Sequence, residues 1–166
     1  MSINSKQKGN AFERKTANAL SDRFKDFLGV EKGFIRKPDS GSYFGGMNSS
    51  RTETHLAEIQ TFGDILCPRH FRWTIEAKNY KTPLTLNAIL TQHSKQLDEW
   101  VAQAEQDANN ANRHALLVIK FNQCEPFVLL TEIYPEVKFI YKNYRAYLFE
   151  YFLSFQDNHY FLETSS

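Results

Sequence analysis

Three charged side chains lie close together in residues 62–81, a stretch typical of two short strands joined by a tight turn. Asp64 precedes the apolar residues 65–67, and Glu76 and Lys78 lie in the second run. Because side chains two apart in a strand share a face, Glu76 and Lys78 are expected side by side. Buried charges cost free energy unless they have partners. Two carboxylates beside an ammonium favour a site for a divalent cation and a positioned water, with a strand-end ion pair between Glu76 and Lys78 as the alternative.

The first third of the chain has one strong helical pattern, over residues 5–28, with Asn4 or Ser5 as its cap. Gly29 suits the left-handed position that ends a helix. Residues 30–37 are typical of a strand, and residues 38–42 of a turn. We expect residues 43–61 to form a loop or flap insertion that contacts substrate, with a short helix over residues 51–60.

The rest of the chain predicts a mixed α/β fold. A turn at residues 68–70 leads to a strand over residues 71–78, and apolar side chains then recur at helical spacing along residues 86–108. Further strands are expected at residues 115–121, 127–133 and 137–141, a strand and short helix at 145–155, and an edge strand at 159–163. The helix allows the strands before and after it to run parallel through a right-handed crossover. The expected architecture is a mixed central β-sheet flanked by helices, in one domain over residues 1–166.

Composition indicates a globular protein with an uneven distribution of charge. Of 166 residues, 42% are apolar, and the formal net charge is +1. Residues 1–51 hold ten Lys and Arg against five Asp and Glu, which predicts an anionic partner there or simply a solvated surface. Two lone cysteines, Cys67 and Cys124, predict free thiols in a reducing compartment and argue against a zinc site. The polar N-terminus and the lack of a long apolar run favour a cytoplasmic protein without a signal peptide or membrane span.

The order Glu13, then Gly63-Asp64, then Glu76-Ala77-Lys78 resembles the PD-(D/E)XK nuclease superfamily, and most of all the archaeal-type Holliday junction resolvases. Residues 8–14 resemble their opening helix, residues 35–42 their strand and Ser-Gly-Ser loop, and residues 75–78 the E-x-K motif. The resemblance covers residues 8–121 and implies a restriction-endonuclease-like three-layer core. The segment between residues 42 and 64 is longer than in those resolvases, and Gly63 takes the place of the proline.

The resemblance also implies roles for the charged cluster. Asp64, Glu76 and the backbone carbonyl of Ala77 would bind Mg²⁺, for which Mn²⁺ can substitute. Lys78 would orient and help deprotonate the attacking water, or offset charge in the transition state, and burial beside a metal would lower its pKa. Glu13 would bind the metal through water or hold a second ion, with an ion pair at the rim of the core as the alternative.

Other residues are expected to contact DNA. Arg36, Ser40 and Ser42 would bind phosphate, although a Ser-Gly-Ser turn is also common without any ligand. On the second helix Gln92 or Gln96 would touch substrate, while His93 is expected in the core. The basic residues that would follow the DNA backbone are Lys6, Lys8, Arg14, Lys15 and Arg51.

These observations predict a Mg²⁺-dependent DNA endonuclease, with resolution of branched DNA as the leading activity. The alternatives are a restriction- or repair-type nuclease on linear or nicked duplex, and a nucleic-acid-binding protein with a vestigial site. A four-way junction has near two-fold symmetry, so a resolvase of this size is expected to act as a homodimer. The aromatic-rich residues 134–161 are expected to supply the dimer patch or, alternatively, a crowded core.

Overall fold

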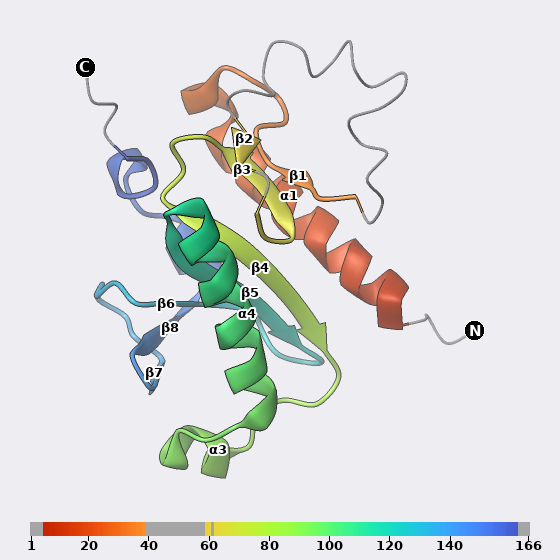
Figure 1. The fold of residues 1–166 in the computed structure, drawn as a ribbon, viewed down its shortest axis with the longest axis vertical. Helices are drawn as coiled ribbons and strands as arrows, with labels where there is room; N and C mark the ends of the chain where they lie inside the picture. The colour runs from red at the N-terminus through yellow and green to blue at the C-terminus, as the bar shows by residue number, and fades with distance from the viewer. Residues whose placement is uncertain (1–4, 39–58, 61, 163–166) are drawn as a thin grey trace.

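The computed structural model describes residues 5–38, 59–60 and 62–162. Its sheet has the strand order β1-β3-β4-β5-β6-β8-β7, and β2 pairs with β3 beside this path (Figure 1). All neighbouring strands run antiparallel except β4 and β5, so the sheet is mixed, as predicted. The strands are β1 (Ile35–Arg36), β2 (Ile59–Gln60), β3 (Ile65–Pro68), β4 (Trp73–Tyr80), β5 (His114–Phe121), β6 (Phe127–Leu130), β7 (Phe139–Tyr141) and β8 (Tyr144–Leu148).

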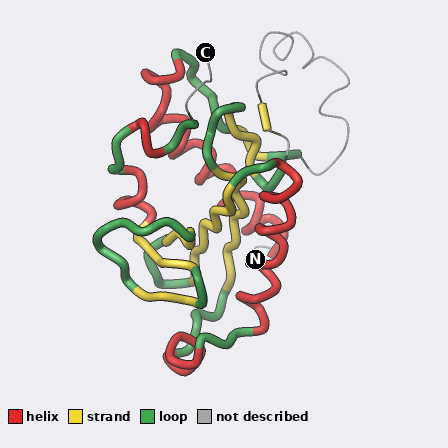
Figure 2. The backbone as a smooth tube through the Cα atoms, turned by 60° about the vertical axis from the view of Figure 1, so that its left-hand side comes forward, coloured by secondary structure: helices red, strands yellow, loops and turns green. Residues whose placement is uncertain are grey.

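Helices flank the sheet, as Figure 2 shows, and each face has its own apolar cluster. Phe12, Leu20 and Phe24 of α1 (Ser5–Leu28) pack in one cluster, which also contains Phe152 of α5 (Phe149–Leu153). Leu97 of α4 (Lys95–Ala111) packs in the other cluster, against β5 and β8. The crossover through α3 (Leu86–Thr91) and α4 makes β4 and β5 parallel, as predicted from the sequence.

One strand prediction near the site was wrong, and one helix prediction there is tested only at its last two residues. The strand expected at residues 30–37 is limited to β1, because the backbone N–H and C=O of Phe34 bond the Ser21 hydroxyl of α1 instead of a neighbouring strand. Of the short helix expected at residues 51–60, residues 51–58 lie outside the described residues, and residues 59–60 form strand β2 instead. The Ser-Gly-Ser turn and residues 43–58 of the expected flap also lie outside the described residues.

The predicted helix over residues 86–108 is in fact two helices. Gln92 adopts a left-handed conformation (φ 52°) that ends α3, and the Ser94 side chain accepts the N–H of Leu97 to begin α4. His93 lies at this break with 79% of its side chain exposed, so the expectation of a core histidine was wrong. The expected edge strand at residues 159–163 is instead a 3₁₀ turn (Asp157–His159) and one bridge between Phe71 and Phe161.

The aromatic-rich residues 134–161 lie largely in the core. Tyr144, Tyr147, Phe152 and Tyr160 are buried, and Trp73 packs edge to face against Phe152 at 5.6 Å between ring centroids. Much of the segment is therefore core, while Tyr134, Tyr151 and Phe155 are only partly buried, and the dimer patch stays a prediction.

The two cysteines are free thiols, with Cys67 buried and Cys124 partly so. None of the helices in the described ranges combines the length and apolar character needed to cross a bilayer.

Candidate metal and catalytic site

Two backbone hydrogen bonds, to two different neighbouring segments, hold Asp64 in place. Its N–H donates to the carbonyl of Ile75 in β4 at 2.8 Å, and its own carbonyl accepts the N–H of Lys37 at 2.9 Å. The side chain is also held, because Oδ2 accepts the backbone N–H of Ala77 at 3.0 Å. The carboxylate of Asp64 is therefore anchored against the middle of β4, beside the residues of the E-x-K motif.

Gly63 makes this approach possible. Its φ is +81°, and a Cβ built on it would lie 2.6 Å from the Ile75 oxygen and 3.1 Å from the Ile75 nitrogen. These are backbone atoms of the residue before Glu76, so they cannot move aside without moving the site. Glycine is therefore required here both by conformation and by space.

We expect Gly63→Ala to destabilise the protein by about 1–3 kcal/mol, because it adds backbone strain and a clash, and to displace Asp64. Thermal unfolding and cleavage rate measured together test this. The matched control is Gly9→Ala in α1, where an added Cβ meets nothing within 4 Å and should preserve or raise stability. Equal melting temperatures for Gly63→Ala and wild type would contradict the expectation.

Lys78 joins the two carboxylates. Its Nζ lies 2.7 Å from Oε2 of Glu76 and 3.4 Å from Oδ2 of Asp64. The Glu76 side chain is only 1% exposed, and its other oxygen, Oε1, has no hydrogen-bond partner among the described residues. A buried carboxylate oxygen without a partner is costly, and a bound cation is one way to satisfy it.

The structure adds one residue that the sequence reasoning missed. Gln103 of α4 lies with Oε1 3.3 Å from Nζ of Lys78, so α4 orients the ammonium group from across the site. Gln103 follows Gln96 by seven residues, which is about two helical turns and places both on one side of α4. That spacing was the signal available in the sequence.

The pKa of Glu76 is raised to about 8, mainly by burial and then by the nearby charge of Asp64, while Lys78 acts in the opposite direction. Burial alone would lower the pKa of Lys78, but the charges of Asp64 and Glu76 outweigh it and the net shift is upward. The lowered pKa expected for Lys78 is therefore not found in the metal-free site. Without metal, Lys78 is an ammonium ion, and Glu76 is a protonated carboxyl group below about pH 8.

The oxygen atoms present fit a hard divalent cation. Asp64 and Glu76 supply carboxylate oxygens, and the N–H and C=O of one strand residue point the same way. Because the N–H of Ala77 points to Asp64, its carbonyl points to that side as well. Within the described ranges, no three His, Cys, Asp or Glu side chains are grouped as metal ligands, so a cation here would rely on two carboxylates, the carbonyl and waters.

Glu13 lies on the α1 side of the sheet and pairs with Arg36. Its Oε2 is 2.7 Å from Nε of Arg36, whose Nη2 also donates to Asn10 at 2.9 Å. Arg36 is opposite Ile65, a member of the α1-side core. This is the ion pair that the sequence left open as the alternative for Glu13, and the roles of Glu13 at the metal and of Arg36 at phosphate stay predictions.

The remaining predicted contact residues are spread around the molecule. The Gln92 carboxamide accepts the N–H of Lys142 at 2.7 Å, at the turn between β7 and β8 and away from Lys78. Lys8 bonds the side chain of Asn122 after β5, and Arg14 is exposed on α1. Ser40, Ser42 and Arg51 lie outside the described residues.

The raised pKa of Glu76 predicts a pH-dependent stability of the metal-free protein. Between its ordinary value of 4.5 and about 8, the folded state holds a proton that the unfolded state releases. Stability should therefore fall as pH rises through this window. We expect Glu76→Gln, which carries no charge, to have the higher melting temperature near pH 8 in EDTA, with the difference vanishing below about pH 4.5.

Melting curves of both proteins from about pH 5 to about pH 9 test this expectation. Adding Mg²⁺ should stabilise the wild type more at the alkaline end, since the ion binds the ionised carboxylate, and should leave Glu76→Gln unchanged. A difference in melting temperature that is constant across pH would contradict the raised pKa.

Comparison with known proteins gives one match. A family model described as "phage putative PDDEXK endonuclease" matches residues 4–162. No curated protein and no solved structure matches the chain. The matched range covers nearly the whole chain, including Asp64, the E-x-K residues and Gln103.

Proposed function

Because the chain belongs to the phage putative PDDEXK endonuclease family, we propose that it is a Mg²⁺-dependent DNA endonuclease with its centre at Asp64, Glu76 and Lys78. The observation that supports this most directly is the buried Glu76 carboxylate, whose Oε1 has no partner among the described residues and whose pKa is raised to about 8. A buried carboxyl group beside Asp64, with one oxygen left without a partner among the described residues, is suited to bind a cation.

Each residue of the cluster has a distinct task. Asp64, Glu76 and the Ala77 carbonyl would hold the ion, which supplies Lewis-acid stabilisation of phosphate oxygens and a more acidic water. Lys78 keeps both carboxylates in place, and its ammonium donates hydrogen bonds to the phosphate or the attacking water. Its raised pKa favours charge stabilisation over general-base catalysis. Gln103 limits the positions that the ammonium of Lys78 can take.

For the substrate, we propose branched DNA, on the basis of the resemblance to junction resolvases. A restriction- or repair-type activity on linear or nicked duplex is the second candidate, supported by the same cluster. A vestigial site is disfavoured, because Asp64, Glu76 and Lys78 are all present and in contact.

Cleavage of labelled duplex, nicked, flap and four-way junction DNA, with Mg²⁺, Mn²⁺ or EDTA, tests this proposal. We expect cleavage with either ion, none with EDTA, and the highest rate on branched substrates. Glu76→Gln, measured alongside, shows whether any cleavage comes from this site. Cleavage that persists in EDTA, or in Glu76→Gln at the wild-type rate, would contradict the proposal.

We also propose a homodimer, since symmetric incision of a junction needs two sites and the resemblance identifies one per chain. Sedimentation equilibrium without DNA should give twice the 19.4 kDa chain mass. A strict monomer that nicks one strand and releases it would contradict the resolvase assignment and favour the repair-type alternative.

A further inference from the structure

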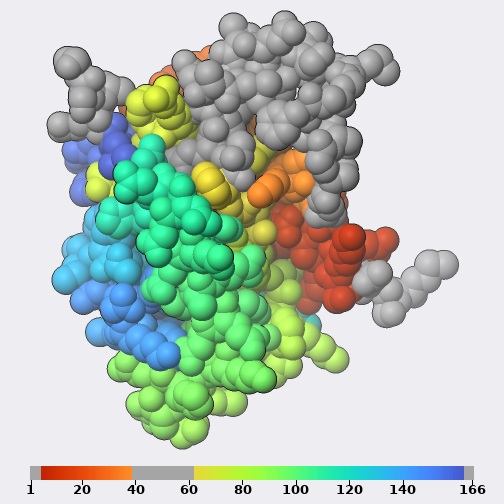
Figure 3. All heavy atoms as spheres, in the orientation of Figure 1, coloured from red at the N-terminus to blue at the C-terminus, as the bar shows by residue number. Residues whose placement is uncertain are grey.

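A line of contacts between β4 and α4 leads from the catalytic cluster to a pocket. Lys78 contacts Gln103, and two residues along β4 the ring of Tyr80 packs edge to face against Trp100 at 5.8 Å. Trp100 lies one helical turn from Gln103 on α4, and Gln96 lies one turn further along. The contacts therefore follow one line, from the site toward the end of the molecule where residues 81–94 project (Figure 3).

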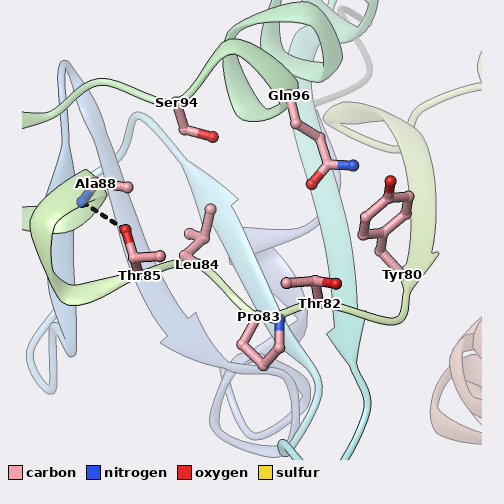
Figure 4. Close-up of a pocket in the computed structure, with 8 residues that line it drawn as sticks. All are labelled: Tyr80, Thr82, Pro83, Leu84, Thr85, Ala88, Ser94 and Gln96. Carbon is pink, nitrogen blue, oxygen red and sulfur yellow. Dashed lines mark hydrogen bonds between the residues drawn. The ribbon is translucent and has the colours of Figure 1, made fainter.

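The pocket at this end has a volume of about 410 Å³, within the range of small-molecule sites. Figure 4 shows Tyr80 and Gln96 on one side of it, Leu84 on the other side and Pro83 below. Tyr80 is 46% exposed although Trp100 packs against its ring, so the residue is held in place and still presents open surface. A positioned, half-exposed aromatic ring over apolar side chains is the usual platform for a stacked base.

Polar groups in the pocket suit the edge of a base. The Gln96 carboxamide makes no hydrogen bond within the described part of the chain, and a carboxamide both donates and accepts hydrogen bonds. The hydroxyl oxygens of Thr85 and Ser94 already accept the N–H groups of Ala88 and Leu97, so each offers its hydrogen to a ligand. Bases present both donors and acceptors on their edges.

Two lysines lie at the same end of β4 as the pocket. The exposed Lys81 follows Tyr80 directly. Lys8 bonds the Asn122 side chain, and the backbone N–H of Asn122 donates to the Tyr80 carbonyl at 3.2 Å. Lys8 and Lys81 therefore lie at the same end of β4 as the pocket, which favours an anionic strand over a neutral small molecule.

We propose that this pocket binds an unpaired base of the strand being cut, next to the phosphate held at Lys78. Residues 78 and 80 are about 6.6 Å apart along β4, about the reach of one nucleotide in an extended strand. A base can enter the pocket only when it is unstacked from its neighbours, so the substrate is DNA with unpaired nucleotides beside the cut. This inference rests on the proposed nuclease function. It narrows the substrate class from branched DNA in general to branched DNA with unpaired nucleotides beside the cut.

The test is binding in EDTA, which separates the pocket from catalysis. A forked duplex carries the fluorescent base 2-aminopurine at successive positions of one unpaired arm, and a fully paired duplex of the same sequence serves as reference. We expect wild type to quench the fluorescence at one unpaired position. Tyr80→Ala should lose this quenching and bind the fork on the order of ten- to a hundredfold more weakly, with unchanged affinity for the paired duplex.

Two further variants sharpen the result. Tyr80→Phe keeps the ring and should keep the quenching, whereas Gln96→Ala should weaken fork binding without removing the stacked base. Leu90→Ala on α3, exposed and outside the pocket, is the control and should bind as wild type. Equal fork affinity and quenching in wild type and Tyr80→Ala would overturn the proposal. Failure of the nuclease function itself would appear separately, as absence of Mg²⁺-dependent cleavage by the wild type.

Discussion

Asp64→Asn and Glu76→Gln are each expected to abolish cleavage while leaving the protein folded. Removing one carboxylate charge from a site for a divalent ion removes several kcal/mol of transition-state stabilisation, on the order of a thousandfold or more in rate. Folding should survive in Asp64→Asn, because the carboxamide oxygen can still accept the N–H of Ala77, as the Asp64 carboxylate does at 3.0 Å. Single-turnover cleavage at saturating Mg²⁺ is the measurement.

The control for these two variants is Asp22→Asn, the same change at an exposed position of α1. It should cleave as wild type. Binding of uncleaved DNA in EDTA should change little in Asp64→Asn and Glu76→Gln, since their effect lies in holding the ion. Wild-type cleavage rates in either variant would show that the ion, if one is required, binds elsewhere.

The proximity of Asp64, Glu76 and Lys78 could be predicted because it depends on local geometry. Glu76 and Lys78 share a face of β4 by the two-residue period of a strand, and Asp64 precedes the antiparallel partner strand. The parallel pairing of β4 and β5 could also be predicted, since a helix between two strands permits that crossover. These relations need only the order of elements and their periodicity.

What could not be predicted depends on contacts between distant elements. The contact of Gln103 with Lys78 depends on how far α4 lies from the sheet. The spacing of residues within α4 indicates on which side of the helix Gln103 lies, but it does not indicate that distance. The pairing of Glu13 with Arg36 depends in the same way on how α1 crosses β1. The break at Gln92 was missed because the apolar positions of α3 and α4 continue one helical pattern, even though Ser94 is a common capping residue.

The direction of the pKa shift of Lys78 is a further property that the sequence alone did not predict. Sequence reasoning took burial as decisive, but two carboxylates within 3.4 Å of one ammonium outweigh the cost of removing it from water. That balance depends on distances, and of the two roles expected for Lys78 it favours stabilisation of charge over general-base catalysis.

Lys78→Ala is expected to lower kcat by about a hundredfold or more, with a smaller effect on DNA binding, because the ammonium acts mainly on charge that develops in the transition state. The substitution also leaves the buried Glu76 carboxylate without its 2.7 Å partner, which should raise the pKa of Glu76 further. The acidic limb of the rate profile should therefore move to higher pH. Measuring rates across pH separates the two effects.

At high pH, where Glu76 is ionised in both proteins, metal binding by Lys78→Ala should recover while the rate stays low, because the ammonium itself is missing. Gln103→Ala should have a weaker effect of the same kind, since the ammonium is still present but less firmly oriented. Recovery of the full rate by Lys78→Ala at high pH would mean that Lys78 serves only to keep Glu76 ionised. A large loss of melting temperature with the rate otherwise intact would assign Lys78 a structural role instead.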